Sequence, residues 1–314
     1  MTDAKIIRYG AHLSTQGGLD QAIIRAHQIG ANCVQVFSGS PRMWRRTPLS
    51  QIAQTEAWSA QEKLDVKPIF THALYLVNLA SDNPDLRRKS ASSLIHDLSF
   101  DAHVKGSGVI VHLGSHQGRG WAAVQEQVLA ELISILEQTP VTSRLLIENA
   151  ASTKGKIGGD LAEIAWLLHA LTQKKRTKSL ISADRIGWCL DTCHAFAAGY
   201  WLGSATSWQN WLASSSPALL SEPPRFLQTE IQDLDLIKWL KCAHINDSRD
   251  PFASGRDRHD NLFTGTIPPE TLRSIVAWLG ETVQVPCITE VPGMEGGGPD
   301  AENMKRLISC FSPV

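Results

Sequence analysis

The sequence predicts an α/β protein with a single (β/α)8 barrel, whose active site lies at the C-terminal ends of the strands. Short apolar runs rich in β-branched residues recur eight times along the 314 residues, and a helix-like stretch follows each run. The runs are continuously apolar rather than alternating, which is typical of parallel strands that are covered on both faces. Strand–helix alternation of this kind gives either a closed barrel or a doubly wound open sheet.

The eight expected strands lie in residues 6–12, 33–37, 67–73, 108–114, 144–149, 186–192, 239–247 and 286–292. Between them, stretches such as 122–138 and 160–173 repeat apolar residues at three- and four-residue spacing, as a helix with one buried face does. The first strand–helix turn, GAHLSTQGG, lacks the GxGxxG fingerprint of dinucleotide-binding open sheets. The pattern therefore favours the barrel.

No linker rich in Gly, Pro or Ser divides the chain, so we expect one domain over residues 1–314. The least regular stretch, about 200–235, reads as an elaborated connection between the sixth strand and its helix. It carries Trp201, Trp208 and Trp211, which we expect to pack in a small core rather than to stack on nucleic-acid bases.

Composition restricts the class of protein. The chain is 43% hydrophobic and 19% charged, has no apolar run long enough to cross a membrane, and starts without the apolar region of a secretory signal. Six cysteines are scattered without a CxxC pair, as in reduced, buried thiols. These features predict a cytoplasmic protein. The net charge of -1 excludes a polycation, so any nucleic-acid binding must come from a local patch or from metal charge.

The residues that end the strands are unusual, because most of them are histidines or carboxylates. In chain order they are His12, Phe37, His72, His112, Glu148, Asp191, His244 and Glu290. The C-terminal ends of barrel strands converge on one face, so these side chains are expected to share one cleft. His194 lies three residues after Asp191, and Asp257 and His259 lie two apart, on one side of an extended loop.

Nine of these residues suggest a metal site: His72, His112, Glu148, Asp191, His194, His244, Asp257, His259 and Glu290. Four carboxylates in one cleft would raise each other's pKa and destabilise the fold, and divalent metals remove that difficulty. Histidine and carboxylate suit zinc and manganese, and nine ligands are too many for one four-coordinate zinc. We therefore expect two or three ions. Three Zn²⁺ carry six positive charges against four carboxylates, which would attract phosphate.

Several motifs resemble the endonuclease IV family of apurinic/apyrimidinic endonucleases. They are GAHLSTQGGL, HALYLVNLA, VHLGSH, IENAA, LDTCHAFAAGY, HINDSRDPFASGRDRHDNLFTGTI and ITEVPG, in the family's order from about residue 8 to 292. The resemblance implies a TIM barrel with three zinc ions. His72, His112 and Glu148 would hold the first ion. Glu148 would bridge to the second, which Asp191, His244 and Glu290 complete, and His194, Asp257 and His259 would hold the third.

The same resemblance implies the activity. The expected enzyme hydrolyses the phosphodiester 5′ to an abasic site in double-stranded DNA, leaves a 3′-hydroxyl, and also removes 3′-blocking groups. Glu290 and Glu148 would be catalytic, with Glu290 orienting or deprotonating the attacking water. Arg42, Tyr75 and Leu76 match the positions that enter the duplex at the damaged nucleotide. A monomer is expected, in the bacterial cytoplasm and working at the nucleoid.

The sequence also departs from the family's pattern. The loop after Glu148 reads ENAASTKGKIGG where the family has an ENTAGQG-like segment, so its contacts with DNA are open. Leu113 stands where proline is common, and FTG replaces GEG at 263–265. Arginines that could track phosphates are Arg42, Arg45, Arg46, Arg256 and Arg258.

Two other classes of function are compatible with a barrel of this kind. A sugar isomerase or epimerase would use one or two metals and give no reason for a third ligand set. A catalytically silent DNA-binding barrel would be expected to have lost some of the nine residues.

Overall fold

Eight parallel strands close into a barrel in the computed structural model, which describes residues 6–173, 181–214 and 224–312. The strand order around the barrel is β1-β12-β9-β6-β5-β4-β3-β2. The strands are β1 (Tyr9–His12), β2 (Cys33–Phe37), β3 (Ile69–His72), β4 (Val109–Val111), β5 (Leu145–Glu148), β6 (Ile186–Asp191), β9 (Leu240–His244) and β12 (Cys287–Thr289). All eight expected strands are present. The open-sheet alternative is wrong, because β1 pairs with both β2 and β12 and leaves no edge.

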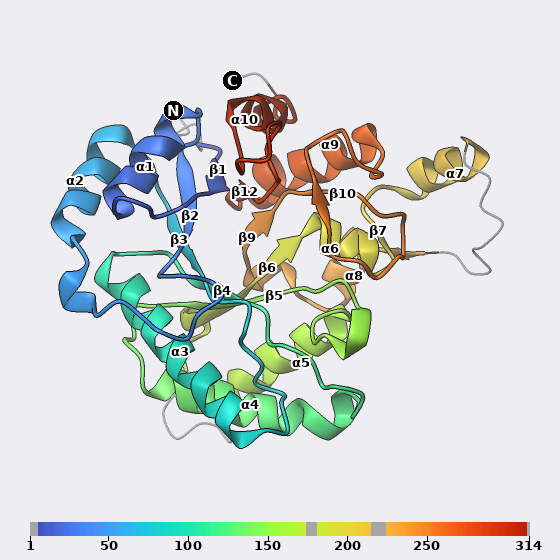
Figure 1. The fold of residues 1–314 in the computed structure, drawn as a ribbon. Helices are drawn as coiled ribbons and strands as arrows, with labels where there is room; N and C mark the ends of the chain where they lie inside the picture. Colours follow the sequence, from blue (N-terminus) through green and yellow to red (C-terminus); the bar gives the residue numbers. More distant parts are fainter. Residues whose placement is uncertain (1–5, 174–180, 215–223, 313–314) are drawn as a thin grey trace.

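Helices surround the barrel (Figure 1). Their bounds are α1 (Leu19–Gln28), α2 (Gln54–Leu64), α3 (Pro84–His103), α4 (Trp121–Glu137), α5 (Leu161–Leu171), α6 (Thr192–Ala197), α7 (Ala205–Ser214), α8 (Leu227–Asp233), α9 (Pro269–Ala277) and α10 (Ala301–Ile308). The amphipathic stretches at 122–138 and 160–173 form α4 and α5, as expected. In the described part of the chain, no helix is long and apolar enough to cross a bilayer.

Short elements complete the structure. They are the 3₁₀ turns Leu49–Gln51, Thr153–Gly155, Ala183–Arg185 and Ile237–Trp239, the π-helical turn Trp278–Val283, and the strand pairs β7 (Tyr200–Trp201) with β8 (Arg225–Phe226) and β10 (Asp247–Ser248) with β11 (His259–Asp260). The turn Thr153–Gly155 lies in the loop after β5, and β11 begins at one of the predicted metal ligands, His259.

Two layers of side chains fill the barrel interior. The lower layer is a buried cluster of Cys33, Phe70, Ile110, Leu146, Cys189, Cys242 and Ile288. Side chains two positions apart along a strand point the same way, so the next layer consists of Gln35, His72, His112, Glu148, Asp191, His244 and Glu290. A polar layer at the C-terminal end of the barrel therefore rests on an apolar floor.

Gly10 allows β1 to complete the closure. A Cβ atom at this position would lie 2.1 Å from the carbonyl oxygen of Cys33 on β2. Any other residue would push β1 away from β2, and His12 sits two positions further along the same strand. Gly10 thus contributes to placing His12 in the polar layer.

The irregular stretch after β6 packs as a small separate core. Helix α6 starts directly after β6, so β7, α7, β8 and α8 lie between α6 and β9; residues 215–223 fall outside the described part. Trp201 and Trp208 are buried with ring centroids 5.0 Å apart, and Trp211 packs on both rings. The tryptophans are therefore core residues, as the sequence predicted.

Candidate metal centre

Side chains from six barrel strands or the residues directly after them, from α6, and from β11 and the loop before it meet at the C-terminal mouth of the barrel. Among the described residues, three groups of potential metal-binding atoms there consist of histidines and carboxylates alone. The groups are His72, His112 and Glu148; Glu148, Asp191, His244 and Glu290; and His194, Asp257 and His259. Within each group the donor atoms all lie within 4.8 Å of one another. All nine residues that the sequence singled out are thus brought together, in the same three sets.

Glu148, at the end of β5, is shared by two of the groups. Its Oε2 lies 3.1 Å from Nε2 of His72 and 3.2 Å from Nε2 of His112. Its Oε1 lies 3.0 Å from Nδ1 of His244 and 3.3 Å from Nδ1 of His194. The carboxyl group is fully buried, and four imidazoles therefore surround its two oxygens.

The second group is centred on Nδ1 of His244. This atom lies 3.3 Å from Oε2 of Glu290 and 3.9 Å from Oδ2 of Asp191, in addition to the contact with Glu148. The side chain of Asn246 donates to Oδ2 of Asp191 at 2.6 Å, and the backbone N–H of His194 donates to Oδ1 at 2.7 Å. The second contact caps α6, so the start of this helix fixes both Asp191 and His194.

The third group lies nearer to the surface. Oδ1 of Asp257 is 2.9 Å from Nε2 of His194 and 3.6 Å from Nε2 of His259. The other oxygen of Asp257 accepts from Nζ of Lys156 at 3.0 Å. Lys156 comes from the loop after β5, whose sequence departs from the family pattern. This loop is held against the loop after β4, where the backbone N–H of Ile157 donates to the oxygen of Gly114 at 2.9 Å.

Burial and opposite charge act against each other on the pKa values of these groups. Burial raises the pKa of the Glu148 carboxyl, but His112 and His244 outweigh it and hold this pKa well below its usual range. Burial lowers the pKa of His194, but the carboxylates of Asp191 and Asp257 raise it well above its usual value. The Glu148 carboxyl is therefore ionised at neutral pH, and a buried negative charge of this kind needs positive charge beside it.

The donor atoms fit bound cations. Nε2 of His259 is buried and has no hydrogen-bond partner among the described residues. It lies 3.6 Å from both Oδ2 of Asp191 and Oδ1 of Asp257, which is too long for a hydrogen bond. A buried nitrogen that faces two carboxylates without bonding either is consistent with a cation shared between them.

The outer nitrogens of two ligands are fixed by the backbone. Nδ1 of His72 donates to the oxygen of Ala73 at 2.6 Å, and Nδ1 of His194 donates to that of Asn149 at 3.1 Å. In the neutral imidazole, each of these bonds leaves the lone pair on Nε2. Outer contacts of this kind orient the imidazoles that bind metals.

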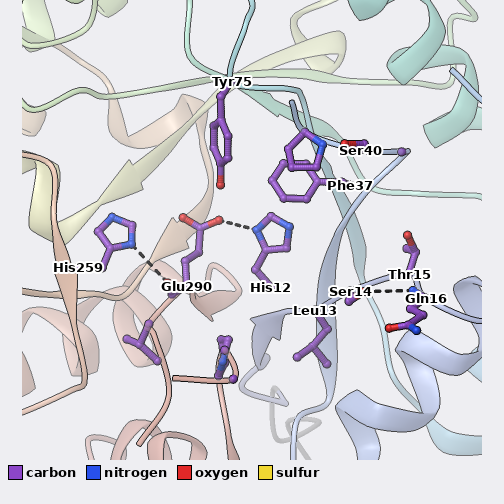
Figure 2. A pocket seen from close by; sticks show the side chains of 16 residues that line it. His12, Leu13, Ser14, Thr15, Gln16, Phe37, Ser40, Tyr75, His259 and Glu290 are labelled. Carbon is purple, nitrogen blue, oxygen red and sulfur yellow. Dashed lines mark hydrogen bonds and ion pairs between the residues drawn. The ribbon is translucent and has the colours of Figure 1, made fainter. Parts of the chain in front are cut away.

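Two adjoining cavities open above the centre. One, of about 620 Å³, is lined by His12, Phe37, Tyr75, His259 and Glu290 among others (Figure 2). The second, of about 540 Å³, shares Tyr75, His259 and Glu290 with the first. It is also lined by His72 and His112 of the first group and by His194 and Asp257 of the third. In Figure 2 the phenol of Tyr75 points at Glu290, whose Oε1 lies 2.7 Å from Nδ1 of His12.

The three predicted DNA-binding residues lie on the rim. Arg42 is exposed, Tyr75 is 58% exposed and Leu76 is 38% exposed. Tyr75 sits in a turn shortly after β3, and its ring packs edge-on against His72 with centroids 5.7 Å apart. Two further exposed apolar residues, Met43 and Met294, were not anticipated.

The structure corrects part of the expected phosphate-tracking set. Arg46 is largely buried and donates to Ser93 at 2.6 Å and to Asp97 at 3.2 Å, so it stabilises the loop after β2. Arg256 and Arg258 both pair with Asp250. Within the described part of the chain, Arg42 and Arg45 are the members of that set that are exposed and show no ion pair.

Sequence reasoning missed two polar residues of the site, Gln35 and Lys156. Gln35 lies inside β2 and not at its end, so the search for strand-end residues selected Phe37 instead. Lys156 lies in an irregular loop, where only its charge distinguished it. Cys189 and Cys242 also lie within reach of His244, but burial raises the pKa of Cys189 well above its usual value, which makes it a poor thiolate ligand.

Comparison with known proteins agrees with the fold. The family model of xylose isomerase-like TIM barrels matches residues 23–313. A protein from Natranaerobius thermophilus named as a probable endonuclease 4 is 31% identical over 301 residues, covering 96% of each chain. The crystal structure of endonuclease IV from Thermus thermophilus superposes with a TM-score of 0.75 at 29% identity, covering 96% of this chain and 98% of that one.

Sugar epimerases share the fold alone. A D-tagatose 3-epimerase-like protein superposes with a TM-score of 0.61 at 14% identity, covering 97% of each chain. This chain belongs to the xylose isomerase-like TIM barrel family and, within it, to the endonuclease IV family.

Proposed function

We propose that this chain is a metal-dependent DNA-repair endonuclease that hydrolyses the phosphodiester 5′ to abasic sites in duplex DNA and leaves a 3′-hydroxyl. The observation that carries the proposal is the third group, His194, Asp257 and His259, beside two groups that share Glu148. A sugar isomerase that uses one or two metal ions would not need this third set of ligands. The same geometry would serve to remove 3′-blocking groups, since those are also joined through a phosphate.

The ligand assignment follows the three groups. His72, His112 and Glu148 would hold one ion; Glu148, Asp191, His244 and Glu290 a second; and His194, Asp257 and His259 a third. Zinc is the metal we propose, because histidine and carboxylate are its usual ligands. When bound, such ions supply Lewis acidity, which makes water acidic enough to attack near neutral pH and neutralises charge on the phosphate.

Glu290 is the residue we assign to the attacking water. Its Oε1 is held by His12 and Gln35, while Oε2 faces the centre of the second group. A carboxylate fixed at one oxygen can orient a water at the other and accept its proton. Glu148 contributes differently: buried between four imidazoles, it keeps two of the groups at a set spacing.

Specificity is assigned to the rim. Arg42, Tyr75 and Leu76 would enter the base stack and fill the gap left by an extruded nucleotide, and extrusion costs least where the base is already missing. All nine proposed ligands come from one chain, so the site is complete without a partner. We therefore propose a monomer, with residues 1–314 acting as one unit on DNA in the cytoplasm.

The test is to incubate the purified protein with duplex DNA that carries one abasic analogue, and to map the cut. We expect one incision, 5′ to the analogue, with a 3′-hydroxyl end, abolished by a chelator and restored by zinc. The same duplex without the lesion is the control. Failure to cut, together with metal-dependent interconversion of ketose sugars, would instead establish the epimerase alternative.

A further inference from the structure

Gln35 is a buried amide inside β2 that touches two members of the second metal-binding group. Its side chain has no solvent exposure, and it lies one layer above Cys33 in the barrel interior. A buried amide without hydrogen-bond partners is destabilising. The amide therefore needs an explanation, which its contacts supply.

The contacts fix which way the amide points. One end lies 2.6 Å from Oε1 of Glu290, and the other lies 2.7 Å from Nε2 of His244. A carboxylate can only accept, so the end at Glu290 is the NH₂ group and the end at His244 is the carbonyl oxygen. A carbonyl oxygen can only accept, so Nε2 of His244 must carry a hydrogen.

These two hydrogen bonds determine which atoms His244 and Glu290 present on the sides that face away from Gln35. With its hydrogen on Nε2, neutral His244 keeps a lone pair on Nδ1, which faces Oε1 of Glu148 at 3.0 Å and Oε2 of Glu290 at 3.3 Å. With its Oε1 held by Gln35, Glu290 presents Oε2 to the same point. His12 also binds Oε1 of Glu290, but its Nδ1 lies 2.9 Å from the Gln35 amide rather than against His244.

We propose that Gln35 is a positioning residue that fixes the tautomer of His244 and the orientation of Glu290, and so sets the affinity of the second group for a divalent ion. This proposal rests on the proposed function, because it takes the second group to be a metal site. Outer partners of metal ligands typically change metal affinity by about ten- to a hundred-fold when they are removed.

The test compares ion release from Gln35→Met and wild type in a chelator titration with zinc. Methionine keeps the length of the side chain and removes both hydrogen bonds. We expect one ion to leave Gln35→Met at a chelator concentration about ten- to a hundred-fold lower than in wild type. The ion at His194, Asp257 and His259 should leave as in wild type. Cys33→Ser is the matched control, since it changes the same strand and face one layer below without touching a ligand.

A second readout does not depend on activity. In the zinc-loaded protein, NMR with ¹⁵N-labelled histidine should show His244 with its hydrogen on Nε2 and zinc on Nδ1. The opposite arrangement in wild type, or unchanged affinity for all ions in Gln35→Met, would overturn the proposal. Should Gln35→Met not fold, Gln35→Leu replaces it with the same expectation. A wild-type protein that binds no divalent ion would instead overturn the proposed function, and the role of Gln35 with it.

Discussion

At the scale of single residues, Glu148 shows how the site is built. It is the last residue of a short strand, fully buried, and each of its oxygens contacts two imidazoles. Removing one of those imidazoles would leave charge unbalanced in the interior, which is costly. The nine residues therefore act as one unit, and single substitutions are expected to affect more than one group.

Glu290→Gln tests the residue assigned to the attacking water. The amide keeps the shape and one oxygen but loses the negative charge and the basicity. We expect cleavage of abasic duplex to fall by about a hundred-fold or more, the scale of lost general-base or electrostatic help, while binding of the duplex survives. Single-turnover cleavage and a binding titration measure the two separately. Turnover within a few-fold of wild type would show that another group handles the water.

The double variant Arg42→Ala with Tyr75→Ala separates recognition from chemistry. Both side chains are exposed on the rim and neither belongs to a metal-binding group. Affinity for abasic duplex should fall by a few kcal/mol, about the cost of unstacking one base step, while metal content and folding stay unchanged. Tyr75→Phe is the control, because it keeps the ring. Equal affinity of the double variant and wild type at matched salt would place damage sensing elsewhere, most directly in the loop 150–159.

The nine candidate ligands could be selected from the sequence because most end a strand or directly follow one, and strand ends converge in a barrel. Gln35 could not be found in this way, because it lies in the middle of β2, two residues before the strand-end residue Phe37. Its importance depends on the registration of β2 beside β1, which brings it opposite His12. Lys156 and Asp257 meet only through the packing of two loops far apart in the chain, a contact that no local pattern encodes.

At the scale of elements, one buried carboxyl joins α3 to two strands. Asp101, on α3, accepts from the backbone N–H of Gly108 just before β4 and faces the hydroxyl of Thr71 on β3. Its other oxygen is buried and has no hydrogen-bond partner among the described residues. Burial raises the pKa of Asp101 to about 7. The folded structure around α3 is therefore more stable when the Asp101 carboxyl is neutral.

Asp101→Asn tests this contact through pH. Because the folded-state pKa is raised, the neutral carboxyl favours folding at low pH, and this advantage is lost as the pH rises through about 7. The wild-type protein should lose stability relative to Asp101→Asn between about pH 4 and 7, by at most about 1.4 kcal/mol per pH unit. Thermal unfolding of both proteins across this range measures the difference. A constant difference at all pH values would contradict this, because it would mean that folding does not shift the pKa of Asp101.

The tryptophans of the irregular segment after β6 were predicted to pack in a small core, and they do. The short helices and strands of this segment were not predicted. Its strands are only two residues long, too short to show a pattern in the sequence. Tyr200 explains its attachment, since the phenol oxygen accepts from the backbone N–H of Leu161 at the start of α5 at 2.9 Å. Hydrogen bonds between distant segments of this kind depend on tertiary structure and not on local preference.

At the scale of the whole molecule, the barrel was predicted from the regular alternation of apolar runs and helix-like stretches along the chain. Eight continuous apolar runs can be buried on both faces only when helices cover the outside and side chains fill the inside. The net charge of -1 adds a functional condition. A protein without excess positive charge must attract DNA through a local feature, and the candidate metal centre together with Arg42 is the feature that this chain offers.

The most direct test of the account is the number of metal ions per chain. Elemental analysis of the purified protein, with diffraction at the zinc absorption edge to locate the ions, measures it. We expect close to three ions, predominantly zinc, one in each of the three groups. A single ion in fully loaded protein, with His194, Asp257 and His259 left uncoordinated, would contradict the account and favour a sugar isomerase.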